Sequence, residues 1–358
     1  MIRRYLFSLA LDRRNGFIPA LLKGVLFLVS LIYGALVISL IFLSRILRRP
    51  LGCKVISVGN VTMGGTGKTA LVSYIAELLK REGHTVAIIS RGYKRKVTRS
   101  QGHKVTSAEI MGDEPFMLKE RLKDIPVIVD ANRFRAGERA AREYKADTVI
   151  LDDGLQQWGL KKDLEIVTID ATCPFGNRNL LPRGILRQPL FSLKCADIFL
   201  LTKTNLSRDV AKIKDTLSKI NPDAPIFESF HRPIGFYNIK DPSRVLPVDG
   251  LKGRTATIFS GIGEPVSFKE TARGLGITVG LSFEFPDHHN YTQKEIDEII
   301  NSSTEKKIDT IITTEKDSAR LGHSGISYGE REILVMRIEI VINEEEKFQS
   351  RLRGIYAV

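Results

Sequence analysis

Residues 62–69 have the composition of a loop that binds the phosphates of a nucleotide. They are Thr62, Met63, Gly64, Gly65, Thr66, Gly67, Lys68 and Thr69. Glycines let the backbone curl so that several N–H groups point at one anion, and a helix that begins here adds the positive end of its dipole. Lys68 is expected to reach the β- and γ-phosphates, and the Thr69 hydroxyl to bind Mg²⁺. The segment predicts an ATP-binding site with Mg²⁺ as cofactor.

The loop departs from the strict pattern at one position. A glycine is expected five residues before Gly67, where Thr62 stands. The run from Gly64 to Thr69 resembles the GG-x-GK-T variant of P-loop proteins. It lacks the G-x-G-x-x-G spacing of a dinucleotide-binding turn, so that class of site is excluded here.

Two carboxylates follow the apolar run 149–151. Asp152 stands at the expected end of a buried strand, where it would lie beside the P-loop and help to hold Mg²⁺. Asp153 is a candidate for binding substrate or phosphate. The alternative is an ordinary turn, because Asp-Gly pairs such as Asp153-Gly154 are common in turns.

Apolar runs that alternate with helical stretches surround these motifs. Strands are predicted at 54–59, 85–90, 125–130, 147–152, 164–170 and 196–202. Helices are predicted at 68–81 and 115–122. This alternation is typical of a mostly parallel sheet with helices on both faces, and the predicted fold is a P-loop NTPase-like α/β domain.

Prolines cluster between residues 221 and 253 and interrupt the pattern. Beyond them, strands are predicted at 255–260, 281–286, 309–314 and 332–342, with a helix at 292–300. The expected parts are a membrane anchor (1–50), the P-loop domain (51–225), a smaller C-terminal α/β domain (226–345) and a C-terminal tail (346–358).

Residues 24–44 form an uncharged run of 21 residues, flanked by arginines and lysine. As a helix the run would be about 30 Å long, the thickness of a bilayer's hydrocarbon core. It predicts a transmembrane helix, with a buried helix of a soluble core as the alternative. A cleaved signal peptide is disfavoured, because RILRRP follows the run in place of a cleavage site. ATP is cytosolic, so the rest of the chain is expected at the cytoplasmic face.

Lysine and arginine exceed aspartate and glutamate by 13, which implies an anionic partner. The sequence has no zinc-finger spacing or RNP-type pattern, so nucleic acid is not the expected partner. Its three cysteines are widely spaced and fit a reducing compartment better than a disulfide framework.

Further motifs follow the P-loop in a fixed order. They are Ser90-Arg91-Gly92-Tyr93, Gly112-Asp113-Glu114-Pro115, Asp152-Asp153-Gly154, Gly176-Asn177, Leu186-Arg187, Asp287-His288-His289 and Thr313-Thr314-Glu315-Lys316-Asp317. From the N-terminal helix to about residue 320, the chain resembles the tetraacyldisaccharide 4′-kinase family of Gram-negative bacteria.

The resemblance implies an enzyme that uses MgATP to phosphorylate the 4′-hydroxyl of tetraacyldisaccharide 1-phosphate, giving lipid IVA. The implied partners are this glycolipid, ATP and membrane lipid. The implied location is the cytoplasmic face of the bacterial inner membrane, since a substrate with four acyl chains stays in the bilayer.

The resemblance also implies roles for individual residues. Asp113 matches the family's catalytic aspartate, a general base, and His288 its histidine partner. From the residues alone, Asp113 is equally well a helix N-cap and His288 an ordinary turn histidine. Candidates for binding phosphate or substrate are Arg91, Tyr93, Arg133, Asp153 and Arg187. The guanidinium groups of the three arginines match phosphate oxygens, and each of these arginines is equally well a surface or structural residue.

Two positions depart from the family's pattern. Gln157 stands where the family commonly has a histidine after its DDG motif, and Gln188 where it commonly has a glutamate after Arg187. Both changes remove a titratable group near the predicted metal, and Mg²⁺ prefers hard, often charged oxygen ligands. The details of the metal site are therefore expected to differ from the family's.

Two other functions fit parts of the sequence. A membrane-associated P-loop regulatory ATPase would use the same loop, but it has no need of a second α/β domain that carries the DHH and TTEKD motifs. A kinase for another lipid-linked acceptor is compatible with every motif, and only acceptor specificity separates it from the family's activity.

Overall fold

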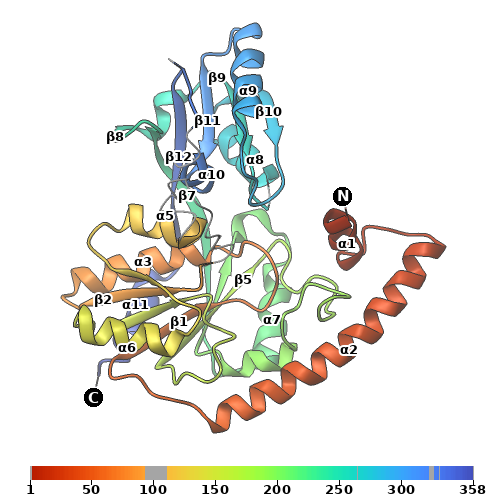
Figure 1. Cartoon of the computed structure of the whole chain (residues 1–358), viewed down its shortest axis with the longest axis vertical. Coiled ribbons are helices and arrows are strands. Elements are labelled where there is room, and N and C mark those ends of the chain that lie inside the picture. Colours follow the sequence, from red (N-terminus) through yellow and green to blue (C-terminus); the bar gives the residue numbers. More distant parts are fainter. Residues whose placement is uncertain (1, 93–110, 264, 322–325, 330, 358) are drawn as a thin grey trace, which may run out of the picture. The chain divides into compact units, whose positions relative to one another are not determined.

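The computed structural model describes residues 2–92, 111–263, 265–321, 326–329 and 331–357 of the chain (Figure 1). Its internal contacts divide the chain into two compact units. The first comprises residues 1–91, 124–230 and 340–358, and the second comprises residues 92–123 and 231–339.

The first unit is built on a parallel sheet with the strand order β3-β2-β4-β1-β5-β6-β7. Its strands are β1 (Lys54–Gly59), β2 (Val86–Ser90), β3 (Val127–Val129), β4 (Thr148–Asp152), β5 (Leu164–Asp170), β6 (Ile198–Thr202) and the start of β7 (Ile226–Asn238). Its helices after the N-terminal pair are α3 (Lys68–Arg81), α6 (Arg133–Glu143), α7 (Val210–Ile220) and α11 (Glu345–Arg353), with short 3₁₀ turns at Leu190–Cys195 and Thr204–Leu206.

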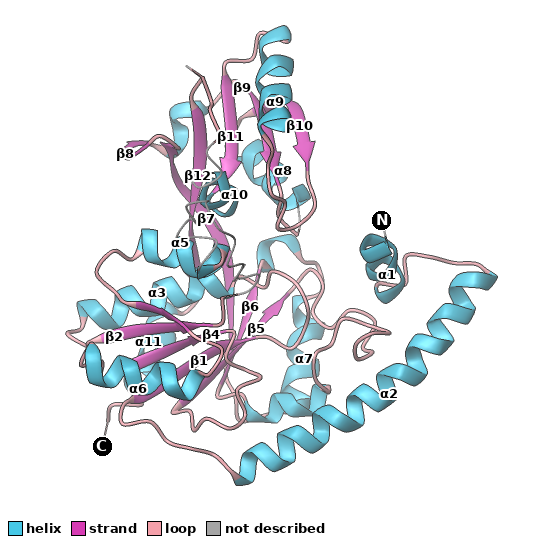
Figure 2. Ribbon diagram, in the orientation of Figure 1, coloured by secondary structure: helices cyan, strands magenta, loops and turns pink. Residues whose placement is uncertain are grey.

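The strands of this sheet are apolar because both of its faces are covered (Figure 2). Val149 and Leu151 of β4 pack in one core cluster with Ala136 and Ala140 of α6. Ile150 points to the opposite face and is also fully buried. Continuous apolar strands of this kind are the mark of a parallel sheet between helices.

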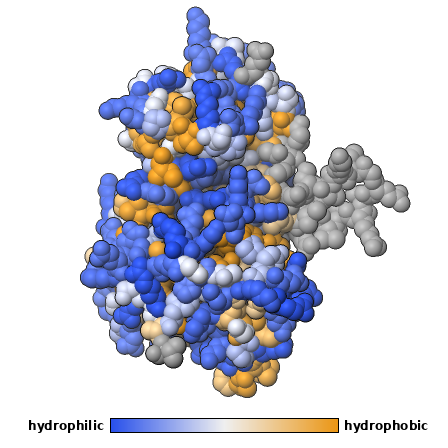
Figure 3. Space-filling view, turned by 90° about the vertical axis from the view of Figure 1, so that its left-hand side faces the viewer, coloured by the Kyte–Doolittle hydropathy of each residue, from blue (hydrophilic) through white to orange (hydrophobic). Residues whose placement is uncertain are grey.

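Two helices precede the sheet, α1 (Ile2–Ala10) and α2 (Phe17–Ile46). The 30-residue α2 is the one described helix long and apolar enough to cross a membrane, and it extends the predicted span of 24–44 at both ends. Most of its large apolar side chains are exposed. The face of the molecule in Figure 3, seen from the side away from α2, is mainly hydrophilic, with apolar side chains in smaller groups.

The second unit has a sheet with parallel pairing from β10 through β9 and β11 to β12, followed by β7 and antiparallel β8. Its strands are the rest of β7, β8 (Asp241–Leu246), β9 (Thr255–Ser260), β10 (Thr278–Glu284), β11 (Thr310–Thr314) and β12 (Ile333–Ile342). Its helices are α5 (Asp113–Arg121), α8 (Pro265–Gly274), α9 (Gln293–Glu305) and α10 (Glu315–Leu321), with a 3₁₀ turn at Val248–Leu251.

The predicted α/β fold with a mostly parallel sheet is confirmed, and each predicted strand overlaps an observed one. The proline-rich segment at the expected domain boundary holds the 13-residue strand β7. Residues 226–228 of β7 pair with β6 and residues 236–238 pair with β8, so Pro233 lies between these two paired stretches.

The structure divides the chain differently from the predicted domains in two places. Residues 92–123, placed in the P-loop domain, belong to the second unit, because α5 packs against α10 and Lys316 pairs with Glu114 at 3.3 Å. The predicted C-terminal tail holds α11, whose Phe348 and Leu352 are fully buried in the first unit.

Candidate active site

The predicted phosphate loop connects the end of β1 to the start of α3. Gly67 adopts a left-handed conformation with φ 76°, which an L-amino acid with a side chain rarely adopts, and Lys68 begins the helix. Gly59 ends β1, where a Cβ atom would come within 2.5 Å of the backbone nitrogen of Leu155. Glycine at position 59 therefore lets the turn after β4 pass close to the loop.

Both ends of the loop are fixed by side chains from the sheet. The Thr66 hydroxyl lies 2.8 Å from that of Thr168, and the Thr202 hydroxyl donates to the Thr66 carbonyl at 3.2 Å. The Asn60 amide donates to the Thr62 carbonyl at 2.8 Å. Thr62 and Thr66 are buried, whereas Met63, Gly64 and Gly65 between them are exposed. The middle of the loop thus faces solvent, where an anion can reach its backbone.

The ammonium group of Lys68 lies among acceptor oxygens at the carboxyl ends of the strands. It donates to Asn60 Oδ1 at 3.0 Å and lies 3.5 Å from Asp153 Oδ1. The Lys68 side chain is only 12% exposed. A triphosphate would offer this charge stronger acceptors than the amide does.

Arg187 joins the loop to the turn after β4. Its guanidinium group forms two hydrogen bonds with the Asp153 carboxylate at 2.8 and 3.0 Å, and its Nε donates to the Thr62 carbonyl at 3.1 Å. The same group also contacts Asn60 Oδ1 and Gln156 Oε1. Two cations, Lys68 and Arg187, therefore share one carboxylate.

The two carboxylates after β4 differ in their surroundings. Asp152 pairs in register with Val58 of β1, is 2% exposed and accepts a hydrogen bond from the Ser90 hydroxyl at 3.2 Å. Asp153 has a left-handed backbone with φ 57°. Burial raises the pKa of Asp153, but the charges of Lys68 and Arg187 and their hydrogen bonds outweigh it and bring this pKa to about 2.

We expect the stability of the chain against denaturant to depend on pH through the ionisation of Asp153. Its pKa in the folded chain lies below the ordinary value of 3.8, so its stabilisation is fully present above about pH 4 and is lost as the pH falls to about 2. Denaturant titrations between pH 5 and pH 2 should therefore show the difference between wild type and Asp153→Asn shrinking with falling pH. A difference that stays constant over this range would contradict the assignment.

Arg133 and Arg91 belong to the same end of the sheet. Arg133 begins α6, is 3% exposed and donates to the Asp130 carbonyl at 2.6 Å. Burial lowers the pKa of Arg133, the Asp152 charge opposes this effect, and the Arg91 charge adds to it. No described residue accepts a hydrogen bond from its Nε–H group, so this donor is available to a phosphate oxygen. The predicted site residue Tyr93 lies outside the described residues.

The predicted proton-transfer residues belong to the second unit. Asp113 is the first residue of α5 and Gly112 takes the N-cap position, so the alternative of an N-cap aspartate does not hold. The side chain of Asp113 lies outside what the structure describes. His288 has a left-handed backbone with φ 59°, and its N–H donates to the Gly261 carbonyl at 3.1 Å.

The two neighbouring histidines have different contacts. His289 Nε2 lies 3.0 Å from both carboxylate oxygens of Glu295, and its ring stacks on Phe285. His288 Nδ1 lies 3.3 Å from Nη2 of Arg320, whose side chain is 4% exposed. Because arginine can only donate, His288 Nδ1 accepts this bond. His289 thus has a packing role, and His288 is held in one orientation.

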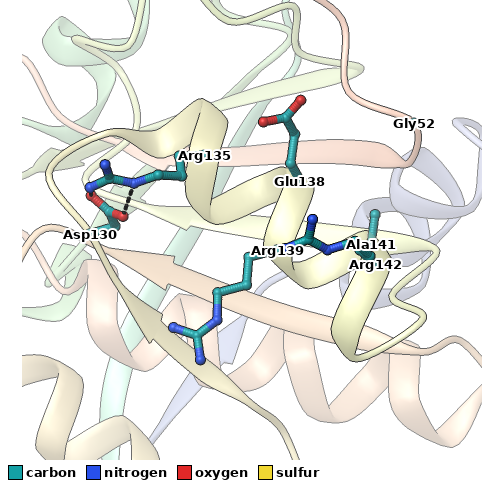
Figure 4. Close-up of a pocket in the computed structure, with 7 residues that line it drawn as sticks. All are labelled: Gly52, Asp130, Arg135, Glu138, Arg139, Ala141 and Arg142. Carbon is teal, nitrogen blue, oxygen red and sulfur yellow. Dashed lines mark hydrogen bonds and ion pairs between the residues drawn. The ribbon is translucent and has the colours of Figure 1, made fainter.

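The hollow in Figure 4 lies along α6. It is lined by Gly52, Asp130, Arg135, Glu138, Arg139, Ala141 and Arg142. None of these is a predicted site residue. Two of its three arginines are paired at 2.7 Å, Arg135 with Asp130 and Arg139 with Glu143, and Arg142 lies 3.7 Å from Glu143.

Sequence reasoning missed two residues that contact predicted site residues: Asn60 in the first unit, which contacts Lys68, and Arg320 in the second unit, which contacts His288. Asn60 is fully buried directly after β1, and the signal available in the sequence was a polar residue between a predicted strand and a glycine-rich loop. Gln188, at one of the two divergent positions, is fully buried, and neither polar atom of its side chain has a hydrogen-bond partner among the described residues.

Comparisons with known proteins identify the family. The model of the tetraacyldisaccharide-1-P 4′-kinase family matches residues 22–357. The tetraacyldisaccharide 4′-kinase of Halothermothrix orenii is 37% identical over 330 residues, covering 85% of each chain. That of Elusimicrobium minutum is 35% identical over 313 residues, covering 85% of this chain and 82% of its own. The crystal structure of Aquifex aeolicus LpxK in complex with ATP superposes with a TM-score of 0.71 at 29% identity, covering 93% of this chain and 99% of that one. The chain therefore belongs to the tetraacyldisaccharide-1-P 4′-kinase family.

Proposed function

We propose that this chain transfers the γ-phosphate of ATP to the 4′-hydroxyl of tetraacyldisaccharide 1-phosphate, giving lipid IVA for lipid A biosynthesis. The proposal rests above all on one observation. This chain belongs to the kinase family, and Lys68 of its predicted P-loop lies beside Asp153, which also pairs with Arg187. Both cations can bind the phosphates of ATP in place of this carboxylate.

The first unit supplies the nucleotide groups. The exposed backbone of residues 63–65 receives phosphate oxygens, and Lys68 neutralises charge that develops on the transferred phosphoryl group. Arg187, Arg133 and Arg91 offer guanidinium donors to phosphates of ATP or of the acceptor. Phosphoryl transfer depends mainly on such positioning and charge neutralisation.

Mg²⁺ fits two oxygen donors, one at the start of α3 and one at the carboxyl end of β4. Thr69 offers a buried hydroxyl and Asp152 a buried carboxylate, both hard ligands of the type this ion prefers. The described residues contain no cluster of three or more acidic, histidine or cysteine ligands. That is compatible with Mg²⁺, which keeps several waters and binds through one or two protein groups plus phosphates. When bound, the ion would neutralise phosphate charge.

The second unit supplies proton transfer. Asp113 takes the proton from the acceptor hydroxyl, and His288 orients or assists it. Both residues lie in one unit, so the pair can be held by a single framework in which Arg320 fixes the ring of His288.

The enzyme works at the cytoplasmic face of the inner membrane. ATP is available on that side, and an acceptor with four acyl chains does not leave the bilayer. The apolar surface of α2 and the surplus of basic residues both suit a membrane with anionic headgroups.

The test is transfer of labelled phosphate from MgATP to tetraacyldisaccharide 1-phosphate in detergent micelles. We expect wild type to form a bisphosphorylated lipid, and Asp113→Ala to lose at least about 100-fold in turnover while retaining ATP binding, since general base catalysis contributes about 10²- to 10⁴-fold. The matched control is Asp124→Ala, whose exposed carboxylate pairs with Lys80.

Two outcomes would contradict the proposal. ATP hydrolysis that does not depend on acceptor, with no labelled lipid, would favour a regulatory ATPase. Phosphorylation of a different lipid-linked acceptor, with tetraacyldisaccharide 1-phosphate inert, would keep the kinase and change its substrate.

A further inference from the structure

Helix α2 is held against the first unit along one face. Its buried residues are Ser30, Gly34, Val37 and Ile41, at spacings of four, three and four that place them on one side of a helix. At Gly34 an added Cβ would come within 2.7 Å of Leu180 Cδ1. The helix therefore lies closely on the segment around residues 180–187, and its remaining faces carry the exposed apolar side chains.

One hydrogen bond connects this helix to the segment that borders the P-loop. The Tyr33 hydroxyl donates to the backbone carbonyl of Arg187 at 2.8 Å. The backbone N–H of Arg187 donates to the Val61 carbonyl at 2.8 Å, and that of Met63 donates to the Ile185 carbonyl at the same distance. Residues 185–187 thus run beside residues 61–63, the entry to the phosphate loop.

The side chain of Arg187 extends the connection to the phosphate-binding groups. It contacts the Thr62 carbonyl and the Asp153 carboxylate, and Asp153 in turn lies beside Lys68. Arg187 is therefore fixed on one side by a tyrosine of the membrane helix and on the other by the P-loop. A shift of α2 along this face would move the arginine and the loop with it.

We propose that Tyr33 is a positioning residue for the nucleotide site, through which α2, when seated on residues 180–187, holds Arg187 and the entry of the P-loop in the arrangement that binds ATP. This inference rests on one part of the proposed function, the binding of ATP by the same loop, and not on the identity of the acceptor. It gives α2 a second role beside membrane attachment.

The experiment uses the full chain in lipid nanodiscs and replaces Tyr33→Phe, which removes only the hydroxyl. One net hydrogen bond corresponds to a factor of about two- to tenfold in affinity. We expect KM for ATP, and Kd for a fluorescent ATP analogue measured without acceptor, to rise by that factor. KM for the glycolipid and sedimentation with membranes should stay unchanged. The control is Ser39→Ala, which removes an exposed hydroxyl bonded only within the helix to the Ala35 carbonyl.

A second pair of variants tests the seating of the helix itself. Gly34→Leu places a side chain where Leu180 lies and should weaken binding of the ATP analogue. Leu180→Ala in the same chain should restore binding by making room. Unchanged nucleotide affinity in Tyr33→Phe and Gly34→Leu, or an effect confined to glycolipid KM or membrane attachment, would overturn the inference. Normal analogue binding in wild type without lipid phosphorylation would refute the proposed function and leave the inference standing.

Discussion

Replacing Lys68 with alanine is expected to lower kcat by about 100- to 1,000-fold, the usual cost of removing one preorganised group that stabilises transition-state charge. Lys68 is the first residue of α3 and its side chain is 12% exposed, so no solvent cation takes its place easily. Without the Lys68 ammonium group, Arg187 is the one described residue that still forms an ion pair with Asp153. Binding of ATP should weaken less than turnover, because backbone N–H groups and the helix N-terminus still contact the phosphates.

The measurement is initial-rate kinetics with saturating MgATP and glycolipid, and the matched control is Lys80→Ala. Lys80 belongs to the same helix but is 45% exposed and pairs with Asp124 at 2.9 Å. Its loss removes the same charge from the chain without touching the loop, so kcat should stay within twofold of wild type. Comparable losses in both variants would mean that net charge, and not the loop, controls turnover.

Much of the fold followed from local sequence patterns. Strands β1, β4 and β5 are continuous apolar runs bounded by polar turns, and a run of this kind has few ways to bury itself other than inside a parallel sheet. The turn between β1 and α3 could be predicted because its glycines are needed for backbone conformation, as the left-handed Gly67 shows. Such features depend on neighbours in the sequence.

The features that sequence analysis missed depend on partners that lie far apart in the chain. Arg187 meets Asn60 and Asp153, and Tyr33 meets the Arg187 carbonyl, over separations of 34 to 154 residues. The placement of α5 in the second unit depends on its packing against α10, some 200 residues later. The prolines near β7 predicted a domain boundary, since the sequence does not tell which of the residues there pair with another strand.

Asp317 is expected to be the residue whose loss costs the second unit most stability. It is fully buried and accepts hydrogen bonds from the Gly261 N–H and the Tyr291 hydroxyl at 3.0 Å, and from the Thr314 hydroxyl at 2.6 Å. Burial and the Asp317 charge raise the pKa of Tyr291, so this hydroxyl keeps its proton and donates. Asp317 also pairs with the buried guanidinium of Arg320 at 3.0 Å.

Asp317→Ala would leave the Arg320 charge in the core without this carboxylate, and breaking a buried ion pair from one side costs about 3–5 kcal/mol. Native-state hydrogen exchange of the β9 and β11 amides should report this loss in the second unit, with exchange of β1 and β4 in the first unit as an internal reference. Asp309→Ala is the control, because Asp309 is 91% exposed and its pair with Arg331 contributes about 0–1 kcal/mol. Equal exchange in the two variants would contradict the prediction.

Arg320 also holds His288, so Asp317→Ala should lower kcat even at temperatures where the chain stays folded. The stability of this buried pair is thereby linked to the orientation of the proposed proton-transfer histidine.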